Sequence, residues 1–289
     1  MIARRWFAAS AAYLGMLAVA ALTVGPFLWL LVTALRGDGE NIFRYPPTLL
    51  PEQPTLANFS AVWVAVPFGR YVLNSALVAV AAVVLNLVLA SLAAYPLARM
   101  DFRGRQPIFY AILATMMVPF PVILIPLFTI VMKLHGGVMA VVPEALDSGY
   151  WRYAWLVLPT GVSAFGIFLM RQAFLAIPRE LEEAVRMDGG TSWDIWRRVM
   201  LPLSRPALAT LAIFTFVGSW GDFLWPLVVL DDPQYYTLPV GVSYLAGTFS
   251  ANWRLIAAGS VIAVVPIVAF FLVMQRHFVG GSTAGAVKG

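Results

Sequence analysis

The sequence predicts an all-α integral membrane protein, and three observations lead to this fold class. Hydrophobic residues make up 61% of the 289 residues, and charged residues make up only 11%. The mean hydropathy of +0.83 suits lipid better than water as the solvent, because a soluble domain needs more charge on its surface. The apolar residues also occur in runs of about twenty, the length of helix that crosses a bilayer.

Six such runs are separated by short polar or proline-rich connectors, so we predict six transmembrane helices. The runs lie at residues 12–35, 71–97, 107–132, 154–174, 207–230 and 255–274. The loops at 36–70 and 133–153 are too short to be soluble domains. We therefore divide the chain into an N-terminal span with its external loop (1–70), a core of five spans (71–280) and a terminal tail (281–289).

Composition excludes several kinds of site. The chain has no cysteine and only two histidines, which rules out disulfides, zinc–thiolate sites, cysteine nucleophiles and a histidine metal cluster. It lacks the Gly-x-x-x-x-Gly-Lys-Ser/Thr pattern of a nucleotide-binding loop. No acid–base pair or activated nucleophile can be assembled at membrane depth. We therefore expect a non-catalytic membrane chain and not an enzyme.

The basic residues predict the orientation. Of the nineteen Lys and Arg residues, thirteen fall in loops on one side of the six spans and six on the other. Because cytoplasmic loops carry the excess of positive charge, both termini and the connector at 178–202 are expected in the cytoplasm. The basic residues raise the pI to about 9.7, but they act as topology signals, so no nucleic-acid partner is expected.

The most informative connector is 178–202, which places charged residues between the fourth and fifth spans. We predict a first helix of about ten residues, with Pro178 at its first position and three glutamates near the positive end of its dipole. Gly189 is expected to end this helix in the left-handed conformation. A second helix is expected to begin at Thr191 or Ser192 and to end at Pro202.

A helix of about ten residues is too short to be stable alone in water, so the first helix needs support from another surface. Docking into a partner protein would provide that support. The alternative is a solvated surface helix in which Glu183 pairs with Arg179 or Arg186, a pair worth well under about 1 kcal/mol.

These residues carry a resemblance to a known family. The connector resembles the EAA loop of ABC importer permease subunits, whose pattern is Glu-Ala-Ala, three residues, Gly, nine residues and Ile-x-Leu-Pro. Glu183, Ala184, Gly189, Leu201 and Pro202 match it. Val185 replaces the second alanine and Val199 the isoleucine, so the docking surface is altered in shape but the spacing is intact.

The resemblance covers nearly the whole chain and is closest to the carbohydrate-uptake branch, in particular to the second permease of the maltose or glycerol-phosphate type. It rests on Asn74–Ser75, Ala94–Arg99, Phe165–Leu169, Ser219–Phe223 and Thr283–Gly289. It implies the fold of a type I ABC importer permease. The segment 135–155, with Glu144, Asp147 and Trp151, is more polar than expected for the family, and the sequence assigns it no role.

The resemblance also implies a function and partners. The chain would be the permease subunit of an ATP-driven sugar importer in a bacterial or archaeal plasma (inner) membrane. It would form a heterodimer with a second permease, and it would bind an ATPase homodimer or two ATPase subunits, an external substrate-binding protein and membrane lipid. ATP and Mg would be bound by the ATPase, and this chain would hold no cofactor. The implied coupling residues are Leu181, Glu183, Ala184, Val185, Asp188, Gly189, Leu201 and Pro202.

One carboxylate, Asp222, falls inside a predicted span. Its burial in lipid would cost about 2.5 to 3.5 kcal/mol or more, so it should face protein or water. Trp220 and Asp222 are candidates for the substrate path, with the indole on a sugar face and the carboxylate accepting hydroxyl hydrogen bonds. The alternatives are that Asp222 braces a neighbouring helix or the partner permease, or that the chain is an ion-coupled secondary carrier using Asp222. Such a carrier should have several intramembrane ionisable groups and a visible repeat.

Polar residues of the second span have a simpler interpretation. Asn86, Ser91 and Tyr95 lie within its apolar run. Polar side chains at membrane depth usually form hydrogen bonds between helices. We therefore expect these three residues to join the second span to its neighbours.

Overall fold

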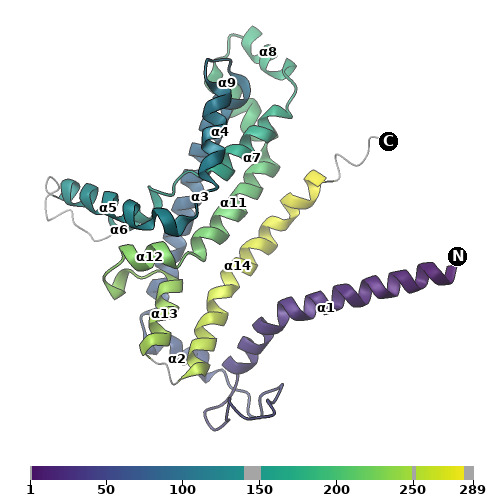
Figure 1. Cartoon of the computed structure of the whole chain (residues 1–289), viewed down its shortest axis with the longest axis vertical. Helices are drawn as coiled ribbons and strands as arrows, with labels where there is room; N and C mark the ends of the chain where they lie inside the picture. Colours follow the sequence, from purple (N-terminus) through teal and green to yellow (C-terminus); the bar gives the residue numbers. More distant parts are fainter. Residues whose placement is uncertain (1, 140–150, 249–251, 283–289) are drawn as a thin grey trace. The chain divides into compact units, whose positions relative to one another are not determined.

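The computed structural model describes residues 2–139, 151–248 and 252–282, and over these ranges the chain is helical and forms no strand (Figure 1). The helices divide between two compact units. The first unit comprises residues 1–69 and 241–266, and the second comprises residues 70–240 and 267–289. The all-α fold class predicted from the sequence is confirmed.

The first unit contains α1 (Ile2–Ala34), the segment that follows it with α2 (Ala57–Ala65), and the adjoining ends of α13 (Leu238–Thr248) and α14 (Trp253–Ser282). The most apolar 18-residue stretch of α1 has no buried residue, which fits a helix solvated by lipid.

The segment between α1 and α2 is held by hydrogen bonds within the first unit. The Asn58 amide, from α2, donates to the carbonyls of Ala34 and Arg36 at 2.8 and 2.9 Å. The Arg254 guanidinium, at the start of α14, donates to the carbonyls of Asp38 and Glu40. The proline-rich loop is therefore held by polar contacts with α2 and α14, together with an edge-to-face ring contact between Phe43 and Trp253.

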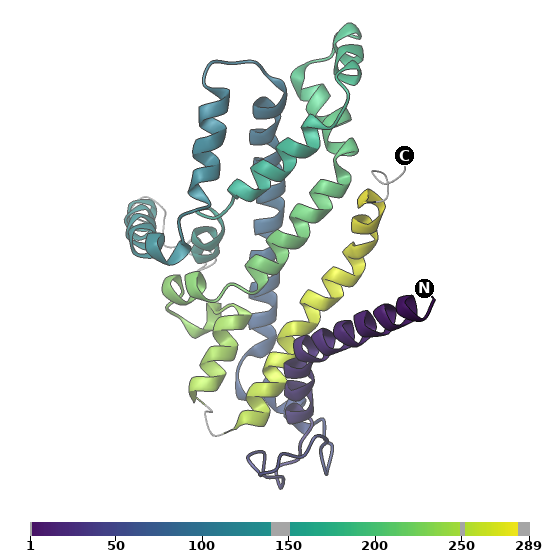
Figure 2. The same ribbon diagram turned by 45° about the vertical axis from the view of Figure 1, so that its right-hand side comes forward.

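The second unit contains the remaining helices. They are α3 (Phe68–Arg99, which begins in the first unit), α4 (Arg105–Thr115), α5 (Phe120–Met139), α6 (Trp151–Val157), α7 (Ala164–Leu175), α8 (Glu180–Met187), α9 (Ser192–Ile195), a π-helical turn (Trp196–Met200), α10 (Leu201–Leu203), α11 (Arg205–Trp220), α12 (Leu224–Val229) and a 3₁₀ turn (Pro233–Tyr235). Helix α7 packs against both α4 and α11, and Figure 2 shows the short loop that joins α3 to α4.

The predicted count of six continuous spans is not reproduced by the described residues. Four helices are long and apolar enough to cross a membrane, and a fifth candidate is a pair of helices bent by 78°. The four helices contain the spans Ala12–Ala34, Phe68–Arg99, Phe120–Val138 and Trp253–Gln275, and the bent pair is Ser192–Leu203 with Arg205–Trp220. The first, second and sixth predicted spans correspond to α1, α3 and α14, whereas the other three are broken.

Each break has a local cause. The third predicted span divides into α4 and α5 just before Pro119, because a proline disfavours the helical conformation of the residue before it. The fourth divides into α6 and α7, and between them a Cβ on Gly161 would lie 2.3 Å from Leu85 of α3. The fifth divides into α11 and α12, and Gly221 is the C-terminal cap of α11. Prolines and glycines thus mark breaks that hydrophobicity alone conceals.

The polar segment at 135–155 is partly helical. Helix α5 continues to Met139 and α6 begins at Trp151, and the residues between them, Glu144 and Asp147 included, lie outside the described residues. His135 of α5 accepts a hydrogen bond from the indole N–H of Trp155 of α6 at 3.0 Å. The two helices that flank the segment are therefore joined by a side-chain contact.

The largely apolar core of the second unit contains a buried asparagine that joins three helices. Asn86 of α3 is buried and donates to the hydroxyls of Ser163 (3.1 Å) and Thr215 (2.8 Å), so it joins α3 to the N-terminus of α7 and to α11. This confirms the expected interhelical role of Asn86. The prediction was wrong for Ser91, whose hydroxyl donates within α3 to the Val88 carbonyl. Tyr95 makes an edge-to-face ring contact with Phe174.

Candidate functional site

The connector at 178–202 forms a helical hairpin that begins with α8. Helix α8 runs from Glu180 to Met187, so it has eight residues and not the expected ten. Pro178 was expected at the first helical position but lies outside the helix, because Arg179 is the N-terminal cap and its carbonyl accepts from the first turn. The predicted acidic first turn is present and contains three glutamates.

The C-terminus of α8 ends as predicted on glycine. Gly189 has φ +78°, in the left-handed region. Its N–H donates to Arg186 at 3.0 Å, and the N–H of Gly190 donates back to Val185 at 2.8 Å, which is the Schellman arrangement. A Cβ on Gly190 would also lie 2.8 Å from the Val185 carbonyl oxygen. The geometry of this turn favours glycine at both positions. Gly189 has a positive φ angle, and Gly190 lies too close to the Val185 carbonyl oxygen for a side chain.

The second arm of the hairpin starts at Thr191 with a capping box. The Thr191 hydroxyl accepts from the backbone N–H of Asp194, and the Asp194 carboxylate accepts from the Thr191 backbone N–H at 3.0 Å. Thr191 was one of the two predicted caps. The arm was expected to end at Pro202 but continues to Leu203 and then bends into α11. Pro202 cannot donate to the carbonyl four residues back. The π-helical turn Trp196–Met200 ends two residues before this proline.

The capping box predicts an acid-sensitive hairpin. The Thr191 hydroxyl and backbone N–H that donate to Asp194 hold the pKa of its carboxyl below the ordinary value of 3.8. A carboxyl with a lowered folded pKa stabilises the fold above the ordinary value, and this contribution is lost as pH falls through the folded pKa. We expect a carboxyl ¹³C NMR titration of Asp194 to give a midpoint below 3.8, and Thr191→Ala to raise it. A wild-type midpoint at or above the ordinary value would contradict the capping box.

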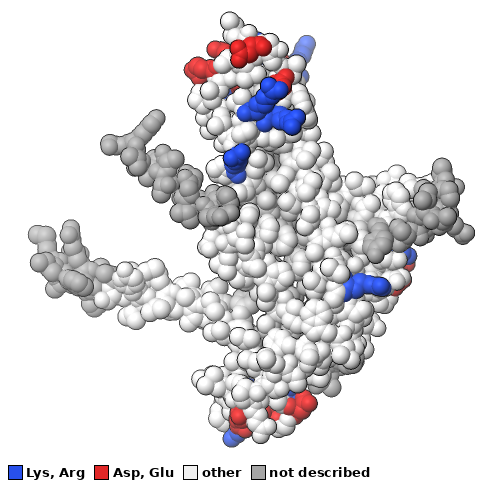
Figure 3. Space-filling view, turned by 180° about the vertical axis from the view of Figure 1, so that it is seen from behind, with Lys and Arg blue, Asp and Glu red and all other residues white. Residues whose placement is uncertain are grey.

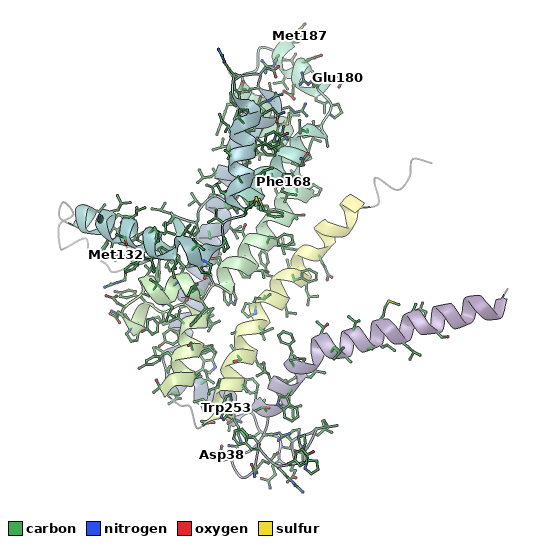
Figure 4. All side chains as sticks on the ribbon, in the orientation of Figure 1. Asp38, Met132, Phe168, Glu180, Met187 and Trp253 are labelled. Carbon is green, nitrogen blue, oxygen red and sulfur yellow. The ribbon has the colours of Figure 1, made fainter. Side chains whose placement is uncertain are left out.

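One side of α8 is exposed. Glu183, Ala184 and Asp188 are exposed, Leu181 is 43% exposed and Met187 is 87% exposed. Figure 4 labels Glu180 and Met187 at the two ends of this helix, and Figure 3 shows acidic and basic side chains gathered at this end of the second unit. Exposed apolar and acidic side chains on a short helix form a surface that a partner protein can bind.

The other side of α8 is held to the core by two residues. Val185 packs on the apolar cluster formed by α3, α7 and the second arm. Glu182 forms an ion pair with Arg99 at 3.0 Å, and the two side chains are only 9% and 4% exposed. Of the implied coupling residues, Val185 is therefore the one on α8 that contacts the core, while the remaining ones on α8 face outward.

Arg99 was treated from the sequence as a topology signal, and Glu182 only as one of three dipole partners, so their pairing was missed. Arg99 is the last residue of α3 and also donates to the carbonyls of Phe174 and Ile177 where the chain leaves α7. No local pattern links residues so far apart in sequence. A charged residue buried at a helix end is recognisable only once its environment is known.

The Arg99–Glu182 pair borders a small open cavity of about 130 Å³. Arg99, Arg179, Glu182, Glu183 and Arg186 line it. In the described part of the chain no ion pair involves Glu183, and the carboxylate that is paired is that of its neighbour Glu182. The alternative in which Glu183 pairs with Arg179 or Arg186 is therefore not found there, and the Glu183 side chain is available to a partner.

The rest of the implied coupling set lies on the second arm. Leu201 is half-buried against the apolar cluster, and Pro202 is exposed. Trp193 and Trp196 stack at 4.6 Å between ring centroids, and Ile195 and Met200 are fully buried. The second arm is thus anchored in the core far more firmly than α8.

The candidate substrate-path residues are separated by the structure. Asp222 lies between α11 and α12, where its carboxylate accepts from the backbone N–H of Trp225 at 3.4 Å. It lines a cavity of about 160 Å³ together with the hydroxyl residues Thr160 and Ser219. Trp220 does not line this cavity. It is 4% exposed and stacks on Phe216 at 5.5 Å.

The cavity walls are otherwise apolar. They come from α3, from α6 and the turn that follows it, and from α11 and α12, and the remaining lining residues are Val78, Ala82, Leu156, Val157, Gly218, Trp225 and Pro226. A carboxylate and two hydroxyl residues in an apolar cavity can accept and donate hydrogen bonds to a hydroxylated ligand. Among the described residues, no group of three or more metal-binding side chains is assembled.

Comparison with known proteins places this geometry in context. The sequence profile of the binding-protein-dependent transport system inner membrane component family matches residues 86–281. An arabinooligosaccharide transport system permease protein of Halalkalibacterium halodurans is 36% identical over 96% of this chain and 95% of its own length. A diacetylchitobiose uptake system permease protein of Streptomyces coelicolor is 35% identical, with 92% of each chain covered.

A third relative is an sn-glycerol-3-phosphate transport system permease protein of Salmonella choleraesuis, 32% identical over 88% of this chain and 89% of its own length. Among solved structures, a chain of a bacterial ABC transporter involved in the import of the acidic polysaccharide alginate superposes with a TM-score of 0.76. The superposition covers 95% of this chain and 97% of the other at 24% identity. At that identity the likeness establishes the fold, which is the expected one of an ABC importer permease.

Proposed function

Because this chain belongs to the family of binding-protein-dependent transport system inner membrane components, we propose that it is the permease subunit of an ATP-driven sugar importer. Three relatives with 32% to 36% identity are named for transport of arabinooligosaccharides, diacetylchitobiose and sn-glycerol-3-phosphate. Carbohydrate is therefore the proposed substrate class. The chain itself binds no nucleotide in this proposal, and ATP and Mg are bound by a separate ATPase.

The proposed coupling role rests mainly on the exposure of the outward side of α8. An eight-residue helix is not stable alone in water, yet most of this one is exposed and its apolar Met187 is 87% exposed. We propose that the ATPase receives α8, with Leu181, Glu183, Ala184 and Asp188 at the contact. Gly189 sets the turn, and Leu201 and Pro202 carry the movement to α11. Closure of the ATPase pair would then move α8 and switch the permease between inward-open and outward-open states.

The remaining partners follow from the family and from charge. A second permease is proposed to complete the translocation path, because this chain presents long apolar helices whose spans are largely unburied within it. The hairpin and both termini lie on the side of the predicted spans that carries the excess of Lys and Arg residues. This excess supports a cytoplasmic location for all three segments. A soluble binding protein on the opposite side is proposed to deliver the sugar to a plasma (inner) membrane complex.

For the substrate path, the support differs between the two candidate residues. Asp222 lines a cavity with Thr160 and Ser219, a set of groups suited to sugar hydroxyls, so we keep it in the proposed path. Trp220 stacks on Phe216, and its contribution would be to shape the wall of the path and not to contact the sugar.

The test is affinity purification of the tagged full-length chain from native membranes in mild detergent, followed by mass spectrometry. We expect a second permease and an ATPase to co-purify with the wild type. Glu183→Ala should recover about fivefold to tenfold less ATPase, the effect of losing one central contact. Glu52→Ala is the matched control, since Glu52 is an exposed glutamate of the external segment paired with an exposed arginine.

Two outcomes would contradict the proposal. A chain that purifies without partners and takes up solute alone under an ion gradient would be a secondary carrier, and Asp222 would become the residue to study. Equal recovery of the ATPase with Glu183→Ala and Glu52→Ala would remove the coupling role from the outward side of α8.

A further inference from the structure

Helix α8 has very few contacts with the rest of the chain. Six of its eight residues are exposed, and the two that face inward are Val185, which is half-buried, and Glu182. A helix of this length has no stability of its own. Its orientation on the permease therefore depends on what these two side chains contact, together with the turn at Gly189.

Glu182 is paired with an arginine whose guanidinium contacts three elements at once. Its carboxylate pairs with Arg99, the last residue of α3, and the same guanidinium donates to the carbonyls of Phe174 and Ile177. Those carbonyls belong to the end of α7 and to the chain that leads into α8. One arginine thus joins the ends of α3 and α7 to the first turn of the hairpin.

A second buried arginine reinforces this joint. Arg171 of α7 donates to the Leu97 carbonyl of α3 at 3.0 Å, and its guanidinium lies 4.1 Å from the centre of the Phe109 ring of α4. Guanidinium groups therefore bind the carbonyls of Leu97, Phe174 and Ile177, where α3 and α7 end. Glu182 and Val185 are the inward-facing residues through which α8 contacts this joint.

We propose that Arg99 and Glu182 form a clasp that positions α8 and makes it move together with the ends of α3 and α7. The inference rests on the proposed function, because the purpose of the clasp is to pass the displacement of α8 by the ATPase into the membrane helices. Arg99 and Glu182 are positioning residues: both are buried, and neither is on the outward side of α8. A planar guanidinium suits this role, since it donates to several acceptors in fixed directions, which a lysine ammonium cannot do.

The test compares Glu182→Gln with Glu180→Gln by hydrogen exchange of the full-length chain in lipid nanodiscs. Both glutamates are in the first turn of α8, so both variants lose the same favourable interaction with the helix dipole. Only Glu182→Gln removes the charge from the buried pair. We expect the amides of α8 to exchange about tenfold faster in Glu182→Gln than in Glu180→Gln, with the amides of α3 and α7 unchanged.

A purely structural role is separated from positioning by a second pair of measurements. Asn86→Leu disrupts buried hydrogen bonds in the core, so it should lower thermal stability without releasing α8. Glu182→Gln should release α8 and reduce ATPase recovery about fivefold or more, although every outward residue of α8 is intact. Glu182→Asp keeps the negative charge, so it should partly restore both the slow exchange of the α8 amides and the recovery of the ATPase.

Each outcome bears on a different claim. Wild-type exchange of α8 in Glu182→Gln would overturn the clasp. Release of α8 by Asn86→Leu to the same degree would also overturn it, because the effect would then be general loss of stability. If the wild-type chain recovers no ATPase while α8 still depends on Glu182, the proposed function fails and the positioning of α8 by Arg99 and Glu182 stands.

Discussion

Replacing Arg99 with methionine is expected to lower the free energy of unfolding by about 3 to 5 kcal/mol, which is the cost of leaving a buried partner charge unpaired. Glu182 would keep a side chain only 9% exposed with no cation beside it. The carbonyls of Phe174 and Ile177 would lose a donor at the same time. Unfolding in mixed micelles with increasing sodium dodecyl sulfate gives the measurement.

The matched control is Arg105→Met. Arg105 also pairs with an acid near the end of α3, at 2.8 Å, but its partner Asp101 is 82% exposed. Such an exposed pair contributes about 1 kcal/mol or less. Equal losses for the two variants would mean that burial of the Arg99–Glu182 pair has no energetic consequence. The double variant Arg99→Met, Glu182→Leu should recover much of the loss, because it removes the unpaired charge.

Gly189→Val is expected to abolish recovery of the ATPase with the chain. The φ angle of +78° at this position costs a non-glycine residue about 1 to 2 kcal/mol, and a β-branched residue more. Nothing lies within 4 Å of a Cβ built on Gly189, so the effect would come from the backbone alone. The strained turn would open, and α8 would no longer present its outward side in a fixed direction.

The control at the same position is Gly189→Asn, because asparagine adopts the left-handed conformation more readily than other residues with side chains. It should retain most of the ATPase recovery measured for the wild type. If valine and asparagine behave alike, the left-handed turn is not what orients α8, and the interpretation of Gly189 as the hairpin's pivot is wrong. Circular dichroism before the pulldown establishes that both variants keep the helical content of the wild type.

The sequence predicted the features that depend on local chemistry. Long apolar runs identified α1, α3 and α14, because crossing lipid requires a continuous apolar helix. The left-handed Gly189 and the cap at Thr191 were also found, since each is set by the preferences of one or two residues. The predictions failed at the third, fourth and fifth spans, because the breaks at their prolines and glycines were hidden by the hydrophobicity of the surrounding residues.

By itself, the sequence determined that the chain is an all-α membrane protein, that it carries a short helical hairpin ended by glycine, and which family it belongs to. Only the tertiary structure decided which side of α8 is free, that Asp222 and Trp220 are separated, and that Glu182 and not Glu183 is paired. Helix caps and apolar runs are local, so residues adjacent in sequence specify them. The partner of a buried charge is chosen by packing, and Arg99 and Glu182 meet because α8 begins where α3 and α7 end.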